Sequence, residues 1–184
     1  MDCEIIRSRR RTMSVEITPS GLRVRAPLRA SNAEIHRFLA EHSAWIEKNL
    51  RKMAGEREAL QKIEPLTKEE LLVLAVRARE VIPARVSYYA PLVGVSYGRI
   101  TIRSQHTKWG SCSSLGNLNF NCLLMLAPPE VLDSVVVHEL CHRKEMNHSQ
   151  RFYAEVLRVF PDYRIWNRWL KENGRLLMAR LPEK

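Results

Sequence analysis

The chain has 184 residues, of which 45% are hydrophobic and 27% are charged, so it is long enough for one well-packed core and has a composition typical of globular proteins. Its net charge of +10 is dispersed along the sequence, which leaves two interpretations open: a basic surface that binds nucleic acid, or a solvated surface without a partner. No apolar run reaches the ~18 residues of a membrane span. The start "MDCEIIRSRRR" lacks the apolar region of a secretory signal, so we expect a cytoplasmic protein.

The first 27 residues predict a β-hairpin or meander. The segments "CEIIRS", "MSVEIT" and "LRVRAP" alternate in part between apolar and polar residues and contain β-branched side chains. Pro19-Ser20-Gly21 supplies turn residues between the second and third segments. We therefore expect a small N-terminal β unit.

A helical arm is predicted to follow this β unit. Ser31 is a candidate N-cap residue with Glu34 three positions later, which is the pattern of a capping box. The helix should run to about residue 63, because Pro65 ends the pattern. Its later part is polar and contains Gly55, so we expect either a break near this glycine or an exposed arm.

Residues 65–184 predict a second unit of helices and strands. Thr67 begins a helix with a further capping box. The stretch from 95 to 125 alternates in part, which is typical of strands in a hairpin or a small antiparallel sheet. Pro128-Pro129 then opens another helix, because proline is tolerated in the first helical turn.

Two more helices are predicted from the sequence pattern in the last part of the chain. They are expected near residues 149–160 and 162–172, and Gly174 is expected to end the second. The order of the elements predicts an α+β protein. Its predicted domains are a β unit with a helical arm over residues 1–64 and a second compact unit over residues 65–184.

The sequence H-E-L-C-H, from His138 to His142, has the spacing of a metal site on a helix. Two histidines at i and i+4 share one helix face, so both imidazoles can reach one ion. Glu139 lies about 100° around the helix from His138. From there its carboxylate can take a proton from a water that the metal activates. Rows of valine and leucine before the motif predict that the helix is buried.

A third metal ligand must come from nearby in the chain. Glu145 is on the same helix face as the histidine pair, but it would lie about 10 Å further along the axis if the helix continued. His148 follows Met146-Asn147, where asparagine can end the helix and let the chain fold back. We therefore expect His148 as the third ligand and a solvated carboxylate at Glu145. Three imidazoles that leave one coordination position open are typical of a catalytic Zn²⁺ site.

The stretch "HELCHRKEMNHSQRFY" resembles the active-site region of the YgjP-like metallopeptidase domain, a small zincin group related to the SprT-like proteases. The blocks "SRRRTMSVEI", "SQHTKWGSCSSLGNLNFN" and "LLMLAPPEVLDSVVVHELCH" resemble that group as well, in the same order. The resemblance implies a zincin-like fold in which a small antiparallel sheet packs on the active-site helix, with an added N-terminal β unit and helical arm. It also implies one Zn²⁺ bound by His138, His142 and His148, with Glu139 as general base.

The segment W-G-S-C, comprising Trp109, Gly110, Ser111 and Cys112, is a candidate substrate strand. In zincins a strand at the sheet edge pairs with an extended substrate, and the small residues Gly110 and Ser111 would let a second backbone approach. The alternative is that these small residues only permit close packing, with Trp109 in the core. Lys108 occupies a position where the resemblance leads us to expect arginine. The positive charge is kept, but the two-pronged hydrogen bonding of a guanidinium group is lost.

Three functions remain open from the sequence. The first is a zinc-dependent metallopeptidase that hydrolyses peptide or protein substrates. The second is a metal-dependent nucleotide pyrophosphatase or related hydrolase, although phosphoryl chemistry usually uses Mg²⁺ and oxygen ligands, whereas a three-histidine site suits zinc. The third is a nucleic-acid-associated protease module or a non-catalytic one, and the presence of Glu139 argues against an inactive site. No membrane partner is expected.

Overall fold

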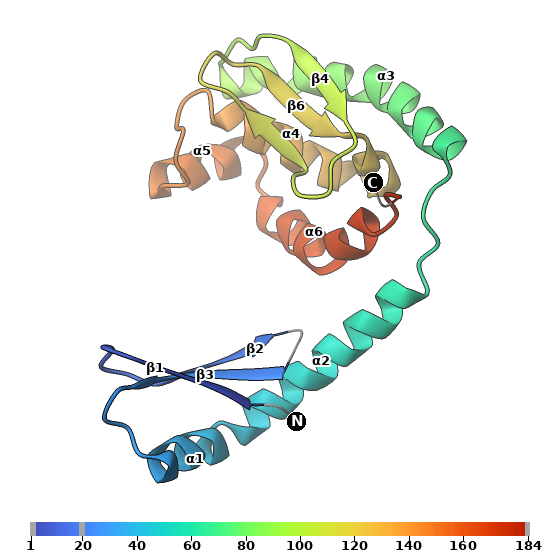
Figure 1. Ribbon diagram of the computed structural model, residues 1–184. Coiled ribbons are helices and arrows are strands. Elements are labelled where there is room, and N and C mark those ends of the chain that lie inside the picture. The colour runs from blue at the N-terminus through green and yellow to red at the C-terminus, as the bar shows by residue number, and fades with distance from the viewer. Residues whose placement is uncertain (1–2, 19–20, 183–184) are drawn as a thin grey trace. The chain divides into compact units, whose positions relative to one another are not determined.

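The computed structural model describes residues 3–18 and 21–182 and confirms the α+β class (Figure 1). The chain divides into two compact units, residues 1–62 and 63–184. Within the described residues, no helix is long and apolar enough to cross a bilayer.

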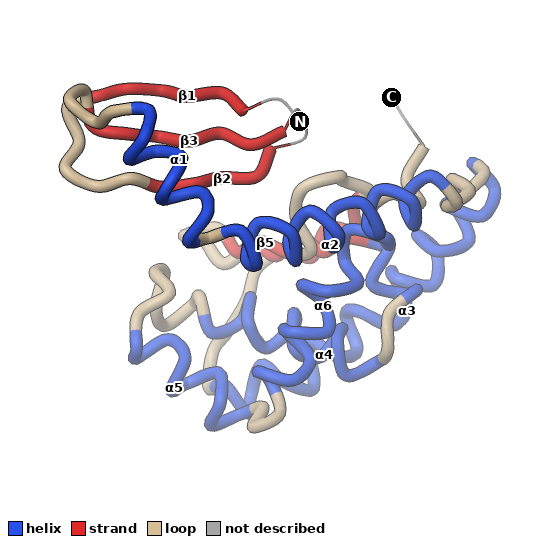
Figure 2. Tube along the Cα trace, turned by 90° about the horizontal axis from the view of Figure 1, so that it is seen from below, coloured by secondary structure: helices blue, strands red, loops and turns tan. Residues whose placement is uncertain are grey.

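In the part of the first unit that the structure describes, the chain forms a mixed three-stranded sheet and two helices. Strand β3 lies in the middle of the order β1-β3-β2, antiparallel to β2 and parallel to β1, so the unit is more than the predicted hairpin or meander (Figure 2). Ile35 of the first helix packs with Val24 and Ala26 of β3, and all three are fully buried. Pro19 and Ser20 of the predicted turn lie outside the described residues. The elements are β1 (Cys3–Ser8), β2 (Ser14–Thr18), β3 (Gly21–Pro27), α1 (Asn32–Glu41) and α2 (Ser43–Gln61).

The helical arm is interrupted at His42 and not near Gly55. The predicted capping box at Ser31 is confirmed, since its Oγ accepts from the Glu34 N–H and the Glu34 carboxylate accepts from the Ser31 N–H. At His42 the backbone leaves the helical region at φ −103° and ψ 9°, and a second helix starts directly afterwards. Gly55 lies inside the second helix, at an open site with nothing within 4 Å of an added Cβ.

The described residues of the second unit form a three-stranded sheet, a 3₁₀ segment and four helices. Its elements are α3 (Lys68–Val93), β4 (Ile100–Arg103), β5 (Gly110–Cys112), β6 (Leu118–Asn121), η1 (Cys122–Leu126), α4 (Pro129–Cys141), α5 (Gln150–Val159) and α6 (Tyr163–Met178). The predicted capping box at Thr67 begins α3. Strand character ends at Asn121, whose side chain accepts from the Leu123 N–H and so starts the 3₁₀ turn.

The sheet of the second unit is mixed and not antiparallel as predicted. Strands β5 and β6 form an antiparallel hairpin, and β4 pairs with the other edge of β6 in parallel, giving the order β4-β6-β5. The hairpin occupies one side of β6, so β4 can pair only with the free side. Strands β4 and β6 are drawn over α4 in Figure 1, and contacts between β5 and α4 hold the sheet to this helix.

Helix α4 lies in the centre of the second unit. The predicted apolar rows are buried, with Val131, Val136 and Leu140 fully inaccessible to solvent. Helix α3 packs against α4 and is joined to it by Arg85, whose Nε and Nη2 donate to the two Asp133 carboxylate oxygens at 2.6 Å each. The ion pair and the apolar packing fix the helix that carries the histidines.

Helix α6 runs through Gly174 to Met178, so the predicted helix end at this glycine is wrong. Gly174 is buried, and a Cβ there would lie 3.2 Å from the indole of Trp109. The absence of a side chain at Gly174 thus permits the close approach of α6 to Trp109. Through this contact the last helix packs against the residue that precedes β5.

Candidate metal centre

The histidine motif lies at the carboxyl end of α4. The helix ends at Cys141 and His142 is its C-cap, so the helix stops before Glu145. Arg143 fixes the turn that follows, because its guanidinium donates to the carbonyl oxygens of Ser96 and Ser114 at 3.2 and 3.0 Å. The chain can therefore fold back within a few residues and bring the next segment to the helix end.

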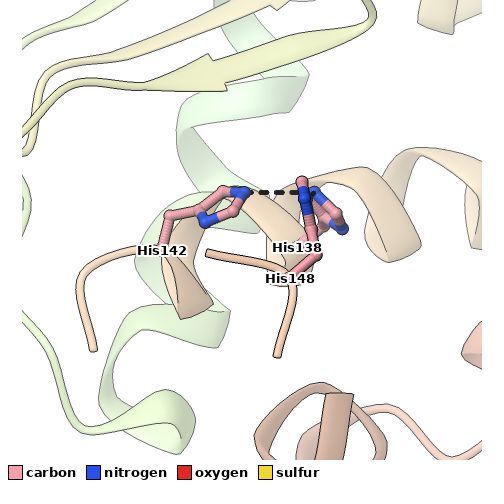
Figure 3. A group of neighbouring side chains, drawn as sticks. All are labelled: His138, His142 and His148. Carbon is pink, nitrogen blue, oxygen red and sulfur yellow. Dashed lines mark hydrogen bonds between the residues drawn. The ribbon is translucent and has the colours of Figure 1, made fainter. Parts of the chain in front are cut away.

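The structure brings His138, His142 and His148 together (Figure 3). The Nε2 atom of His138 lies 3.2 Å from that of His142 and 3.0 Å from that of His148, and the ligand atoms of all three lie within 4.8 Å of one another. A tetrahedral zinc ion with nitrogen ligands at 2.0–2.1 Å separates those nitrogens by about 3.3 Å. The two spacings from His138 are therefore close to this value, and the three imidazoles form a group that could hold one metal ion.

The other ring nitrogens orient two of these imidazoles. His142 Nδ1 donates to the backbone carbonyl oxygen of Glu145 at 3.0 Å, which leaves its Nε2 lone pair facing the cluster. His138 Nδ1 lies 2.8 Å from the hydroxyl of Tyr163, and donation to this oxygen has the same effect. Burial, followed by the neighbouring imidazoles, lowers the pKa of His138 to about 3, so this ring is neutral at physiological pH as a ligand must be.

Phe152 of α5 contacts all three rings of the cluster. Its ring centroid lies 4.9 Å from that of His138, 4.6 Å from His142 and 5.0 Å from His148, and the phenyl ring is fully buried. The contact of Phe152 with the histidines was not predicted from the sequence. Tyr163 was not identified from the sequence at all, because it is 25 residues from His138 and belongs to no local pattern.

Glu139 lies in a cavity of about 210 Å³ that is also lined by His138 and Tyr163. Its side chain is buried, and among the described residues no hydrogen bond is made to its carboxyl group. Burial raises the pKa of Glu139 to about 8, with a smaller opposing effect from the ammonium of Lys108. The carboxyl group thus shares the space beside the histidine cluster and readily takes up a proton there. The Glu145 side chain is outside the cluster.

The segment from Trp109 to Cys112 runs beside Glu139. Strand β5, from Gly110 to Cys112, is an edge strand, with only β6 as a neighbour among the described strands. A Cβ at Gly110 would lie 2.6 Å from Glu139 Oε1, so only glycine lets the strand pass this close to the carboxyl group. Trp109 is half-buried and packs in the core as well as lining the cavity. Pairing of this strand with a substrate stays a prediction.

The fold and the three-histidine cluster define a metallopeptidase. The family model for the YgjP-like metallopeptidase domain matches this chain over residues 11–77 and 71–173. The chain therefore belongs to the YgjP-like family. The family resemblance seen in the sequence is thereby confirmed.

Two archaeal crystal structures are similar to part of this chain. The metallopeptidase zymogen abylysin of Pyrococcus abyssi is 20% identical and has a TM-score of 0.47, covering 52% of this chain and 97% of its own. The metallopeptidase zymogen jannalysin of Methanocaldococcus jannaschii is 24% identical with a TM-score of 0.44, covering 52% of this chain and 96% of its own. A comparison with curated proteins found no similar sequence.

Proposed function

We propose that the chain is a zinc-dependent peptidase in which His138, His142 and His148 hold one Zn²⁺ and Glu139 is the general base. The convergence of the three Nε2 atoms, within 4.8 Å of one another, carries this proposal. Three neutral nitrogen donors match the preference of zinc, whereas Mg²⁺ selects oxygen ligands. When bound, the ion acidifies a water molecule and polarises the scissile carbonyl.

Glu139 would move the proton in this reaction. Its carboxyl group borders the same cavity as His138 and lacks a competing hydrogen bond among the described residues, so it is free to face the attacking water. A nearby cation lowers the pKa of a carboxyl group, so the ionised form is present beside a bound metal and can accept a proton. Glu139 then donates this proton to the leaving amine.

Strand β5 would hold the substrate backbone. It is an edge strand, and Gly110 brings it against Glu139. An extended peptide added to this edge would place its carbonyl groups beside the cavity, with main-chain hydrogen bonds supplying much of the affinity. Trp109 can serve both as a core residue and as the wall of the cavity.

A panel of quenched fluorescent peptides and of nucleoside triphosphates, each assayed with Zn²⁺ and with Mg²⁺, tests the proposal. We expect peptide cleavage that follows the zinc content of the protein as determined by elemental analysis. Hydrolysis of nucleotides with Mg²⁺, without cleavage of any peptide, would contradict the peptidase proposal. It would favour the alternative of a metal-dependent nucleotide pyrophosphatase or related hydrolase. Nucleic-acid binding stays a prediction from the net charge alone, and salt-dependent DNA binding is the measurement that tests it.

Substitution of Gly110 by alanine is expected to reduce peptide cleavage strongly and to leave zinc content unchanged. The added Cβ would meet the Glu139 carboxyl group at 2.6 Å, so either the strand or the carboxyl group must move. A displacement of about 1 Å in a catalytic group can lower the rate by about 10²-fold. The Gly55→Ala variant is the matched control, because its Cβ meets nothing within 4 Å. Equal activity of both variants would contradict the assigned role of Gly110.

The Tyr163→Phe variant is expected to bind zinc about 10-fold more weakly, because loss of an outer hydrogen bond to a ligating histidine typically costs this much affinity. The hydroxyl lies 2.8 Å from His138 Nδ1, and its removal leaves the ring without that partner. Competition with a chromophoric chelator measures the affinity. Tyr153→Phe is the control, since its ring lies near His148 but no hydrogen bond joins its hydroxyl to a described histidine. Unchanged affinity in Tyr163→Phe would remove this residue from the site.

A further inference from the structure

A second hollow adjoins the cavity that contains Glu139. It has a volume of about 370 Å³ and shares three lining residues, Trp109, Asn167 and Leu170, with that cavity. The two hollows are therefore adjacent, and we call the pair of them the Trp109 groove. Its far end is lined by Gly174 and Met178 of α6, so the groove leads away from the histidine cluster along this helix.

The charged side chains of the Trp109 groove are almost all cationic. Lys108 lines the part near Glu139, and Lys171 and Arg175 line the second hollow together with the exposed His106. Glu139 is the single acidic residue among the lining residues of both hollows. Neither Lys108 nor Lys171 has an ion-pair partner in the described parts of the chain. Two lysine ammonium groups are thus available to a molecule bound in the groove.

The floor of the groove is apolar, which increases the effect of these charges. Leu170 is 9% exposed, and the half-buried indole of Trp109 packs over Gly174. A carboxylate that enters over apolar side chains loses part of its hydration and is less screened than on an open surface, so a nearby ammonium group attracts it more strongly. An apolar floor with cationic walls fits an aliphatic side chain that ends in a carboxylate.

We propose that the Trp109 groove is a specificity subsite that selects a peptide substrate with a glutamate or aspartate beside the scissile bond. The inference rests on the proposed peptidase function, because it assigns the substrate class of that site. Glu139 is the proton acceptor at one end of the groove, and Lys171 and Lys108 are specificity residues that receive the substrate carboxylate.

Binding of labelled peptides to the zinc-loaded Glu139→Gln protein tests the subsite without the need for turnover. The peptides carry one Glu, Gln or Lys at successive positions of an otherwise neutral sequence, and fluorescence anisotropy gives the dissociation constants. We expect one position at which Glu binds about fivefold more tightly than Gln, as one partly screened ion pair allows, and at which Lys binds more weakly than Gln. Equal affinity for the three residues at every position would overturn the proposal.

Reversal of the charge at Lys171 then tests whether the preference for acidic peptides arises in the Trp109 groove. Lys171→Glu, made in the same Glu139→Gln protein, should abolish or invert the preference for Glu at that position. Arg168→Glu is the matched control, because Arg168 is exposed on the same helix and lines neither hollow. The same loss in both variants would show that overall charge, and not the groove, causes the preference, and would overturn the proposal.

Peptide cleavage by the protein with Glu139 intact tests the subsite separately from the proposed peptidase function. Cleavage of neutral and acidic peptides at equal kcat/KM, together with equal binding, would leave the peptidase assignment standing and remove the subsite. A preference for acidic peptides in binding, without cleavage of any peptide, would keep the subsite and remove the peptidase assignment.

Discussion

The Glu139→Gln variant should lose peptide cleavage by about 10²- to 10⁴-fold, the range that general base catalysis contributes, while it retains its zinc and its fold. Glutamine has nearly the same shape as glutamate, so the cavity stays filled and the contact with Gly110 is preserved. The amide cannot accept a proton from water at neutral pH. The lost rate therefore reports proton transfer and not a change in packing.

The folded state should tolerate this substitution well. Glu139 is 6% exposed and its carboxyl group has no hydrogen-bond partner among the described residues, so replacement by an amide leaves no partner group unsatisfied. Burial raises its pKa to about 8, which means that the ionised form is costly to keep in the metal-free protein. Thermal unfolding of the metal-free variant at pH 8 should accordingly show a midpoint no lower than that of the protein with Glu139.

Measurement of kcat/KM against zinc content per chain checks this result. Glu145→Gln provides a control with the same chemical change, because the Glu145 side chain lies outside the histidine cluster and its contact with His142 uses the backbone carbonyl oxygen. If both variants cleaved peptides at similar rates with similar zinc content, Glu139 would have no part in the chemistry.

Local patterns predicted the elements of this fold that depend on neighbouring residues. Both capping boxes form where the sequence places Ser31 and Thr67, because each requires only a hydrogen-bonding residue and a glutamate three positions later. The i and i+4 spacing of His138 and His142 likewise follows from the helix itself. His148 could be expected from the chain reversal that Asn147 favours, and the structure brings its ring to the other two.

Features that depend on distant partners could not be predicted in this way. Strand β4 pairs in parallel with the side of β6 that the hairpin leaves free, and no local pattern within β4 indicates this direction. Gly174 lies inside α6, where it packs against Trp109, whereas an isolated glycine near the end of a helical pattern usually indicates a C-cap. The contact between Tyr163 and His138 depends on the packing of α6 against α4.

The interruption at His42 has a local cause that the periodic pattern hides. Apolar positions continue on both sides of it, so the pattern predicts one helix. The His42 ring turns back and its Nδ1 donates to the Phe38 carbonyl oxygen at 2.8 Å, the oxygen that also receives the His42 backbone N–H. A side chain that competes for a helix carbonyl can end one helix and let the next begin.

The His148→Ala variant should lose zinc at concentrations where the unaltered chain is fully loaded, and lose peptide cleavage with it. Removal of an outer contact to a ligand costs about 10- to 100-fold in affinity, so removal of a ligand itself should cost at least about 10²-fold. The remaining pair, His138 and His142, offers two nitrogens where a catalytic zinc site uses three protein ligands. Elemental analysis after dialysis against a weak chelator, followed by a peptide assay, measures both losses.

This variant separates metal binding from folding. His148 is exposed and comes from the segment between α4 and α5, so its truncation removes ring contacts without opening the core of the second unit. Zinc should raise the unfolding temperature of the unaltered chain, because a ligand that binds the folded state stabilises it, and should raise that of His148→Ala much less. His106→Ala is the matched control, since this exposed histidine lies outside the cluster and should leave zinc content unchanged. Full zinc content in His148→Ala would show that the ring at this position is not a ligand, and the site would then need a different third donor.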